Sequence, residues 1–523
     1  MFYARSCQLI GCLILLGWFP ASGQDFSTAI WHAPLEQNPD SAIEGSIWPL
    51  PLTPRAEHWQ AGIEPRVAWR DVPEAGAIQI SRPGWAAGFA LHRHAKTSIE
   101  GHARWDLDVQ VSHFRVGAAT ADLWDEAWST GGAGGAGWAT TPDGQAVHLL
   151  RLWSSFKCQL GPSSELSIGH HPHHWGRGWR SIWLDRQMSP MPYLRYHVDA
   201  GRVQYTQLLG LTHAWGHGSP PLSPSGSSPL NPGRYKSRVP GWMVAQMVEV
   251  DLGHGFHGSL FGAIKWLHVD SAHTKRFEWT YAIPFVAFRP TEYMLGSADN
   301  ALVGIGGGWA SQRVPFDLSM ALMFDEFVLD ELRSNEDWWA NKWATQITAK
   351  AHSKDGQWMG LIESIAARPF TYGHAGAGTA WVHGNSPLAH PAGANFMEFR
   401  GHARWKSVKG PWWVQAGVVH RKQGVDAAER YAFDAPEFTT GWNPLVGYGA
   451  RPADYGIEWL NTGLGQVEGA QLRAQTSIWT SIERDIPKIP GHRVFVRCIS
   501  RSDGQWRLET GLTASRVWDE RGW

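Results

Sequence analysis

The densest run of side chains that could do chemistry lies between residues 168 and 195. It combines tryptophans, arginines and one aspartate: Trp175, Arg177, Trp179, Arg180, Trp183, Asp185, Arg186 and Arg195. Flat aromatic faces can stack on sugar rings, and guanidinium groups bind carboxylates in pairs. All of these residues except Trp183 are therefore candidate glycan-binding residues for an acidic polysaccharide. The alternative is an internal network of charged side chains that braces a wide barrel wall.

The same run opens with four histidines, His170, His171, His173 and His174. Neutral imidazole is a common ligand for zinc and copper. However, Pro172 interrupts the histidines, and no Asp, Glu or Cys stands at a paired spacing. We therefore predict neither a metal site nor a bound cofactor.

Carboxylates that could act as acid and base include Asp325, Glu326, Glu363 and Glu398. A glycosidase needs two carboxylates at a defined separation, and the adjacent Asp325 and Glu326 should point to opposite sides of a strand. The glycine-rich segment 304–308 lacks the third glycine of a dinucleotide fingerprint, and no nucleophile elbow, HExxH motif or P-loop occurs. The sequence thus predicts no catalytic residue, and we expect a protein that is not an enzyme.

Period-two alternation of apolar and polar residues defines the elements that must position these groups. It is clear in residues 103–112, 194–201 and 316–324, where successive side chains of a strand would point to opposite faces. Further strands are predicted at 146–156, 203–210, 243–252, 258–269, 281–289, 343–352, 357–367, 396–405, 412–420, 467–479, 493–500 and 506–514. The chain is therefore expected to be all-β.

The polar faces of these strands favour a transmembrane barrel over a soluble sandwich. In a sandwich the apolar face meets the opposite sheet, whereas in an outer-membrane barrel it meets lipid and the polar face lines the lumen. Here the polar faces carry Arg, Asp, His, Gln and Lys, and many of the 33 tryptophans stand at strand ends, as interfacial girdles require. We predict a large antiparallel transmembrane β-barrel of about 14–18 strands.

The composition excludes nucleic-acid-binding proteins and helical membrane proteins. Among 523 residues, 46 Lys and Arg oppose 47 Asp and Glu, which gives a formal net charge of −1 and no basic footprint for nucleic acid. Beyond the first 20 residues, no apolar run approaches the roughly 18 residues of a spanning helix.

The N-terminal residues resemble a secretory signal peptide. Arg5, the apolar stretch 9–19 and the small residues 21–23 fit a signal peptide over 1–23. Residues 24–75 are rich in proline and are predicted to form an accessory segment in the periplasm or the lumen, so that the barrel would occupy 76–523. Residues 216–233, rich in Pro, Gly and Ser, are predicted to be an exposed loop.

Several ordered blocks resemble the Wzi-like family of capsule-assembly outer-membrane proteins, in the version found in Bacteroidetes that includes a gliding-motility-associated relative. The first block comprises Ile168-Gly169, then 175–181 (WGRGWRS), Leu184-Asp185, Pro190 and 192–194 (PYL). Later blocks are 292–300, 325–327, Trp339 with Asn341-Lys342, 368–372 with His374, and 387–395 with Glu398. Trp179 stands where relatives usually have Tyr, Gly373 where they often have Ser, and residues 519–521 break the alternation of a final strand.

The resemblance implies a barrel of 18 strands that holds or helps to assemble capsular or exopolysaccharide as a lectin. The family-motif positions outside the first block are Asp299, Asn300, Asp325, Glu326, Arg368, Tyr372, His390, Asn395 and Glu398. Expected partners are outer-membrane lipid or lipopolysaccharide, surface polysaccharide, and capsule-export, gliding or secretion machinery, with no nucleic acid. The rival functions are a porin or transport channel and a secreted glycan hydrolase.

Overall fold

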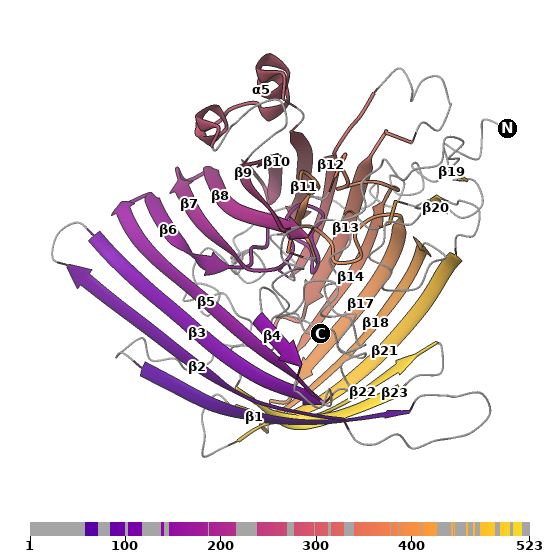
Figure 1. Cartoon of the computed structure of the whole chain (residues 1–523). Helices are drawn as coiled ribbons and strands as arrows, with labels where there is room; N and C mark the ends of the chain where they lie inside the picture. The colour runs from indigo at the N-terminus through magenta and orange to yellow at the C-terminus, as the bar shows by residue number, and fades with distance from the viewer. Residues whose placement is uncertain are drawn as a thin grey trace.

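A closed antiparallel ring of strands forms the body of the protein, as the computed structural model shows (Figure 1). The main sheet has 19 strands; β4 (Gly137–Thr140) adds a short pairing to β5, and each of the other 18 pairs with the next until β23 pairs with β1. Closure leaves no free sheet edge in the ring. The structure describes residues 58–71, 84–99, 103–117, 137–140, 146–186, 188–215, 238–268, 277–297, 299–311, 315–328, 339–376, 378–384, 386–408, 410–425, 441–442, 444, 457–458, 464–465, 471–486, 492–502 and 506–514.

The first half of the ring is formed by β1 (His58–Asp71), β2 (Gly84–Ile99), β3 (Ala103–Gly117), β5 (Ala146–Gly161), β6 (Ser164–His171), β7 (Met191–Asp199), β8 (Val203–Trp215), β9 (Arg238–Gly253) and β10 (Phe256–Leu267). The second half is formed by β11 (Asn300–Ala310), β12 (Phe316–Phe324), β13 (Trp343–His352), β14 (Trp358–Ala367), β17 (Phe396–Lys406), β18 (Trp412–Val425), β21 (Gln471–Asp485), β22 (His492–Arg501) and β23 (Trp506–Ala514). Two small sheets stand apart, β15 (Val382–His383) with β16 (Ser386–Pro387) and β19 (Ile457–Glu458) with β20 (Leu464–Gly465). The predicted all-β barrel is confirmed, with the number of strands that the family resemblance implied.

The two rims of the barrel differ in the length of their connections. At one rim, here the short-turn rim, consecutive strands are joined by two to six residues, as between β9 and β10. At the opposite rim, the long-loop rim, the connections are longer except for residues 502–505. Short turns at one rim and long loops at the other are typical of outer-membrane barrels.

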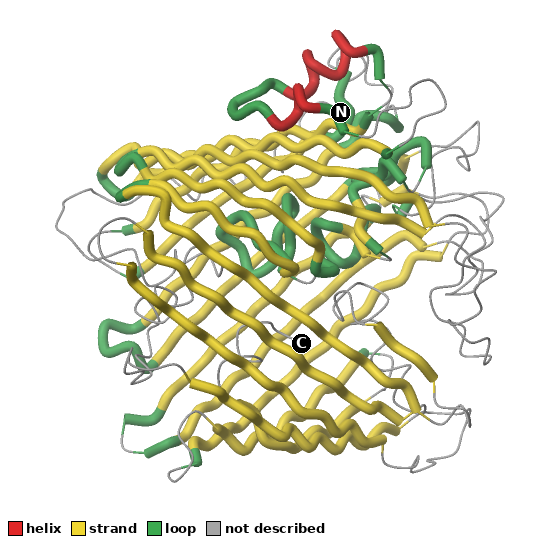
Figure 2. The backbone as a smooth tube through the Cα atoms, turned by 60° about the vertical axis from the view of Figure 1, so that its left-hand side comes forward, coloured by secondary structure: helices red, strands yellow, loops and turns green. Residues whose placement is uncertain are grey.

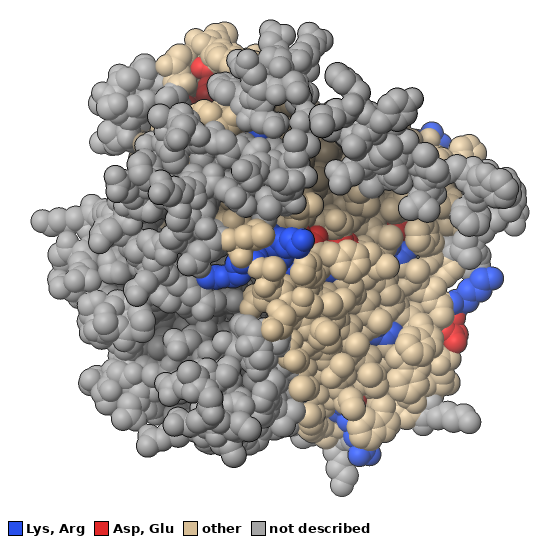
Figure 3. Space-filling view, turned by 90° about the vertical axis from the view of Figure 1, so that its right-hand side faces the viewer, with Lys and Arg blue, Asp and Glu red and all other residues tan. Residues whose placement is uncertain are grey.

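Alternation along each strand sorts side chains into an outer and an inner face. On β12, Phe316 and Met320 point outward and are 36% and 50% exposed, whereas Asp317 and Ser319 point inward and are buried. The outer face is apolar in the same way on β11, β14 and β21. Figure 3 shows a broad stretch of this outer wall with few charged side chains. An apolar outer face and a polar inner face are the reverse of the arrangement in a soluble protein and are typical of outer-membrane barrels.

Aromatic rings line the outer face at the short-turn rim. Phe256, Trp309 and Phe316 follow one another on neighbouring strands, with ring centroids 6.4 Å apart in both steps. Trp358 and Trp405 continue the row with centroids 6.2 Å apart. This arrangement is an aromatic girdle.

The connection between β10 and β11 folds back along the outside of the barrel, where both Figure 1 and Figure 2 place it. It contains the 3₁₀ helix η2 (Trp279–Ala282) and the helix α5 (Phe288–Leu295). The strand predicted at 281–289 is therefore wrong. Pro284 and Pro290 provide the reason, because proline lacks the N–H that a strand ladder needs but fits the first turn of a helix. Among the described residues, no helix is long and apolar enough to cross a membrane.

The N-terminal boundary of the barrel also needs correction. The first strand begins at His58, inside the segment 24–75 that was predicted to be an accessory part, because β1 pairs with both β2 and β23. The predicted signal peptide 1–23 and the predicted loop 216–233 lie outside the described residues. Cys158 on β5 and Cys498 on β22 are both free thiols.

Candidate functional site

Two long connections enter the lumen and pack against each other there. They are residues 172–190 between β6 and β7, here the first luminal loop, and residues 368–395 between β14 and β17, here the second luminal loop; Figure 2 shows green loop segments inside the tube of strands. Asp185 N donates to Leu388 O at 2.8 Å, and the indole N–H of Trp381 donates to Trp183 O at 2.9 Å. Apolar residues of both loops and of the inner wall form one buried core.

Glu363 on β14 fastens the first luminal loop to the wall. Its carboxylate accepts hydrogen bonds from Trp179 N at 2.7 Å and Arg180 N at 3.1 Å. The amide of Gln346 donates to Arg180 O at 2.6 Å and to Glu363 at 2.9 Å, and Thr348 also donates to Glu363. A buried carboxylate that accepts this many hydrogen bonds has a structural role. Glu363 therefore anchors the first luminal loop to the wall.

An internal ion pair shapes the same loop. Arg180 and Asp185 are both buried, with 3.5 Å between Nη1 and Oδ1, and Asp185 also accepts from Ser181 N at 2.8 Å. Burial lowers the pKa of Arg180 to about 10, and the Asp185 carboxylate opposes that shift. Arg180 therefore remains charged at neutral pH and braces the loop.

Trp183 lies flat on the glycine-rich strand β11. Its ring stacks on Phe261 of β10 with centroids 5.3 Å apart and an interplanar angle of 3°. A Cβ at Gly304 would lie 2.5 Å from the Trp183 Nε1 atom, and one at Gly306 would lie 2.8 Å from its Cη2 atom. The glycines thus make room for the indole, which gives segment 304–308 a packing role.

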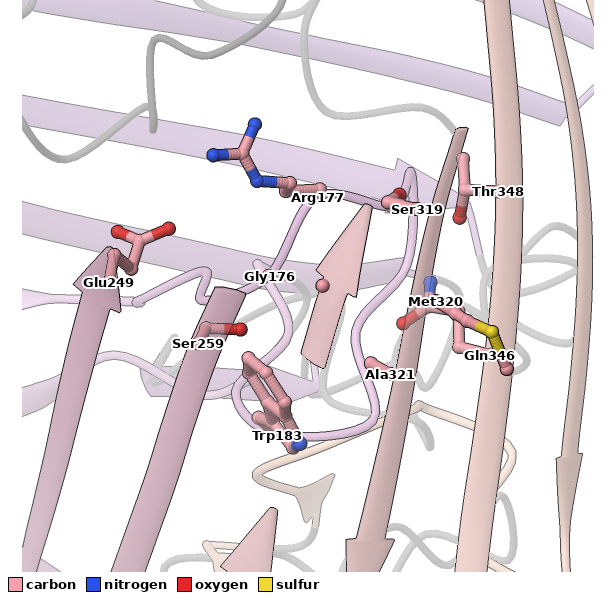
Figure 4. A pocket seen from close by; sticks show the side chains of 12 residues that line it. Gly176, Arg177, Trp183, Glu249, Ser259, Ser319, Met320, Ala321, Gln346 and Thr348 are labelled. Atoms are coloured by element: carbon pink, nitrogen blue, oxygen red, sulfur yellow. The ribbon is translucent and has the colours of Figure 1, made fainter. Parts of the chain in front are cut away.

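A recess remains between the first luminal loop and the wall, with a volume of about 330 Å³ including its opening. Its lining is mostly polar or glycine: Gly176, Arg177, Gly178, Trp183, Glu249, Ser259, Gly307, Ser319, Met320, Ala321, Gln346 and Thr348. In Figure 4, Arg177 and Glu249 lie towards one side, and Gln346 and Thr348 towards the other.

The recess offers one cation, one carboxylate, hydroxyls and an amide. Burial lowers the pKa of Arg177, while the carboxylates of Glu249 and Asp317 oppose that shift. Hydroxyl groups both donate and accept hydrogen bonds, so the groups of the recess match the hydroxyls of a sugar. A guanidinium adds a preference for carboxylate groups.

The predicted glycan-binding residues are divided between this recess and the interior. Arg177 lines the recess. Trp179 lies beside it on the loop, half-buried, with its ring edge-on to His402 at 4.9 Å and Arg186 5.5 Å above it. The indole N–H of Trp179 is buried and has no hydrogen-bond partner among the described residues.

The other members of that set brace the fold. Trp175 is 2% exposed and bridges to Leu184 within the loop. Arg195 on β7 is buried and forms an ion pair with Glu165 on β6, 3.0 Å away. The contacts of four predicted residues therefore fit the alternative interpretation, in which the side chains brace the barrel from inside: Trp175, Arg180, Asp185 and Arg195.

The histidine run contributes packing contacts. His173 meets Tyr193 edge-on at 4.4 Å, and the Nε2 atom of His174 lies 3.1 Å from Gly178 O and 3.4 Å from an Arg186 nitrogen. These contacts pack the first luminal loop on itself and against β7.

Several family-motif positions fasten the second luminal loop at the long-loop rim. Lys342 lies 3.4 Å from Asp325 and 3.3 Å from Glu326 and donates to Gly373 O at 2.9 Å. Asp325 accepts from Tyr372 N at 2.8 Å, and burial raises the pKa of this aspartate to about 6. The Tyr372 hydroxyl donates to Ile182 O, which joins the two luminal loops.

Glu398 organises a second charged cluster deeper in the lumen. It lies 3.0 Å from Arg400, 2.6 Å from Arg421 and 3.5 Å from His390. Arg368 and Asn395 stand at the two ends of the second luminal loop, where Asn395 N donates to Arg368 O at 3.3 Å. This cluster closes the base of the loop.

Asp299 and Asn300 belong to a different part of the molecule. Asp299 accepts from the Tyr281 hydroxyl at 2.8 Å and from Ser297 at 2.6 Å, in the connection that lies outside the barrel. Asn300 begins β11 and is buried. The structure therefore distributes the family-motif positions over three places and does not gather them into one site.

Five residues of the recess come from the wall and were not among the predicted site residues: Glu249, Ser259, Ser319, Gln346 and Thr348. All five occupy inward-facing strand positions. A signal was present, because each belongs to the polar face of a predicted strand. The alternation of polar and apolar residues does not indicate which strands contact the first luminal loop.

Comparisons with known proteins match the architecture at low identity. No family model and no curated protein matches the chain. Among solved structures, an outer-membrane protein of Escherichia coli, Wzi, described as involved in group 1 capsule assembly and as a carbohydrate-binding β-barrel, is 11% identical with a TM-score of 0.47. That match covers 86% of this chain and 84% of Wzi.

Porins also match. A BenF-like porin from Pseudomonas fluorescens Pf-5 is 10% identical with a TM-score of 0.45, covering 87% of this chain and 97% of the porin. OpdL of Pseudomonas aeruginosa is 8% identical with a TM-score of 0.42, over 87% and 97% of the two chains.

Proposed function

We propose that this chain is a non-catalytic outer-membrane barrel that binds capsular or exopolysaccharide at the cell surface. The apolar outer wall, the aromatic girdle and the unequal rims support a membrane location. The N-terminal residues that resemble a signal peptide agree with export to the outer membrane. Lipopolysaccharide and the capsule-export, gliding or secretion machinery are the proposed neighbours.

The observation that carries the proposal is the polar recess beside the first luminal loop. Arg177 supplies charge, and Gln346 and Thr348 supply acceptor oxygens, because their N–H and O–H groups already donate to Arg180 O and Glu363. The half-buried Trp179 next to the recess has an indole N–H without a partner in the described structure. A polysaccharide with acidic sugars offers hydroxyls and carboxylates to match these groups.

Substitution of the recess residues tests the proposal. We expect Arg177→Ala and Trp179→Ala each to weaken binding of the purified barrel to its polysaccharide by about 1–2 kcal/mol, or about 5- to 30-fold. Cell-bound polysaccharide should fall at equal surface level of the protein. Trp358→Ala is the matched control, because this tryptophan lies in the outer girdle, 56% exposed. Unchanged binding in both recess variants would refute glycan recognition at this place.

A porin or transport channel is the second candidate. The closed ring of 18 strands and its polar inner face favour it, and the two luminal loops packed across the interior oppose a wide pore. Conductance of the unmodified chain in a planar bilayer separates the two functions. A large and stable current would favour the channel.

A glycan hydrolase is the third candidate, and the contacts of its best carboxylates argue against it. Glu363 accepts four hydrogen bonds from the first luminal loop and the wall. Glu398 lies between Arg400 and Arg421. We therefore propose binding without chemistry.

A further inference from the structure

The connection between β10 and β11 carries an exposed apolar surface on the outside of the barrel. Residues 277–297, here the external flap, include η2 and α5. Large apolar side chains are exposed along the flap, with exposed fractions between 55% and 76%: Trp279, Ile283, Phe285, Tyr293 and Met294. A soluble surface rarely exposes so many large apolar groups together.

The opposite side of the flap is buried against the outer wall. Tyr281 and Phe288 of the flap form one apolar cluster with the outward-facing Val244, Ile264 and Trp266 of β9 and β10. The flap therefore covers a part of the surface that, elsewhere on the wall, is the exposed apolar belt represented by Leu260, Val303 and Ile305.

Polar groups on the outer wall bind the irregular backbone of the flap. Gln207 on β8 and Gln246 on β9 are direct cross-strand partners. Gln207 Nε2 donates to Ala282 O at 2.9 Å, and Gln246 Nε2 donates to Ile283 O at 3.2 Å. Both glutamines are buried under the flap on the face that is otherwise apolar.

Tyr205 extends this attachment along β8. Its hydroxyl accepts from Phe285 N at 3.2 Å, and its ring stacks on that of Phe285 with centroids 4.1 Å apart. Tyr205 is the third residue of β8 from the short-turn rim, so the flap reaches far from the long-loop rim where the connection starts.

We infer that the external flap lies within the membrane, against the outer wall of the barrel, and contacts lipid acyl chains with its exposed apolar face. This rests on the membrane location in the proposed function. Irregular backbone at membrane depth persists only where protein satisfies its N–H and C=O groups. Gln207, Gln246 and Tyr205 do so for Ala282 O, Ile283 O and Phe285 N.

Lipid is the occupant that the surroundings favour. The exposed face of the flap has the same apolar chemistry as the belt of the wall, because Phe285 and Met294 are exposed as Val303 and Ile305 of β11 are. The helix α5, which carries Met294, packs against β10 and β11. Its half-exposed cation, Arg289, is paired with Glu292 at 2.8 Å and lies 5.0 Å above the Tyr293 ring. Trp279 and Tyr293 are the residue types that occupy membrane interfaces.

Fluorescence quenching of a label on the flap tests the inference. In a full chain with each of its four cysteines changed to Ser, Phe285→Cys carries a fluorophore and the protein is reconstituted in phosphatidylcholine vesicles. We expect strong loss of fluorescence with acyl-chain nitroxide lipids and little loss with aqueous iodide. Ile305→Cys on the wall is the control for lipid, and Lys354→Cys in the exposed β13–β14 turn is the control for water.

The controls separate the possible outcomes. If nitroxide lipids quench the label at Ile305 but iodide quenches the label at Phe285, the flap inference fails and the membrane location stands. If nitroxide lipids quench neither label, the membrane location itself fails. A label at Phe285 that neither quencher reaches would mean that another protein or a second copy covers the flap, and would also overturn contact with lipid.

A second variant checks the attachment without altering the exposed face. Gln207→Leu combined with Gln246→Leu leaves the carbonyls of Ala282 and Ile283 without these donors, so the flap should leave the wall and the label at Phe285 should lose its quenching by lipid. Ser364→Leu, an outward polar position on β14, is the matched control and should change nothing. Unchanged lipid quenching in the double variant would contradict the role of the glutamines.

Discussion

At the scale of single residues, the inward-facing glycines of β11 are as informative as the side chains around them. Gly304 and Gly306 face the lumen where Trp183 lies against the wall, and the indole N–H of Trp183 also donates to Leu322 O at 3.3 Å. Any larger residue on that face must displace the indole or the strand. The tryptophan and the two glycines are therefore one packing unit.

Alanine substitutions test that unit. Gly304→Ala or Gly306→Ala should destabilise the barrel by about 1–3 kcal/mol, because the added methyl overlaps Trp183 in a filled interior. The measurement is the midpoint of thermal unfolding in detergent. Gly360→Ala on β14 is the control, since its Cβ would lie 3.9 Å from the nearest atom, His402 O. Equal effects at all three glycines would rule out the packing explanation.

At the scale of elements, the second luminal loop contains buried histidines that resist protonation. Burial, followed by Lys342 and Arg289, lowers the pKa of His374 from 6.5 to about 3. Burial, followed by His213 and Lys265, holds the pKa of His383 well below its ordinary value. While the second luminal loop is packed in the lumen (docked), these imidazoles stay neutral. A loop released from the lumen (undocked) binds protons at its histidines as the pH falls below about 6.5.

Docking of this loop should therefore weaken between pH 7 and pH 5. Asp325 has the opposite sign, because its raised pKa of about 6 favours the docked state as the pH falls, but two histidines outweigh one aspartate. Hydrogen exchange of the Tyr372 and Trp381 amides, corrected for intrinsic rates, measures the effect. Asp325→Asn should steepen the loss of protection, and His374→Gln should reduce it. Protection that rises on acidification would contradict the assignment.

At the scale of the whole molecule, closure of the ring makes a simple prediction. Every strand of the ring pairs on both sides, including β1 with β23, so the folded barrel should resist dodecyl sulfate at room temperature and migrate differently on a gel before and after boiling. The sample is detergent-extracted membrane. Recovery of the protein in the soluble periplasmic fraction, with no change on boiling, would contradict both the barrel in a membrane and the function proposed for it.

The sequence by itself determined the class of fold, because a strand in a barrel records its two environments in alternating residues. Residues 316–324 and 343–352 were predicted with the bounds that the structure has. In β1 the pattern was also present, at Trp59, Ala61, Ile63 and Val67, but prolines in the same region concealed it. Alternation is a local property, so it can be read without knowing which strands are neighbours.

Only the tertiary structure decided what the conspicuous residues do. The Arg and Trp run was recognised as chemically rich, yet Arg180 and Asp185 proved to be internal braces, while Arg177 and Trp179 lie in or beside a recess. Gln207 and Gln246 looked like ordinary polar residues until they were found on the outer face under the external flap. Loops that fold into the lumen or back along the wall follow no periodic pattern, and hydrogen bonds fasten them to residues as distant in the chain as Glu363 is from Trp179, or Gln246 from Ile283. Such contacts depend on packing between distant segments, which no local pattern encodes.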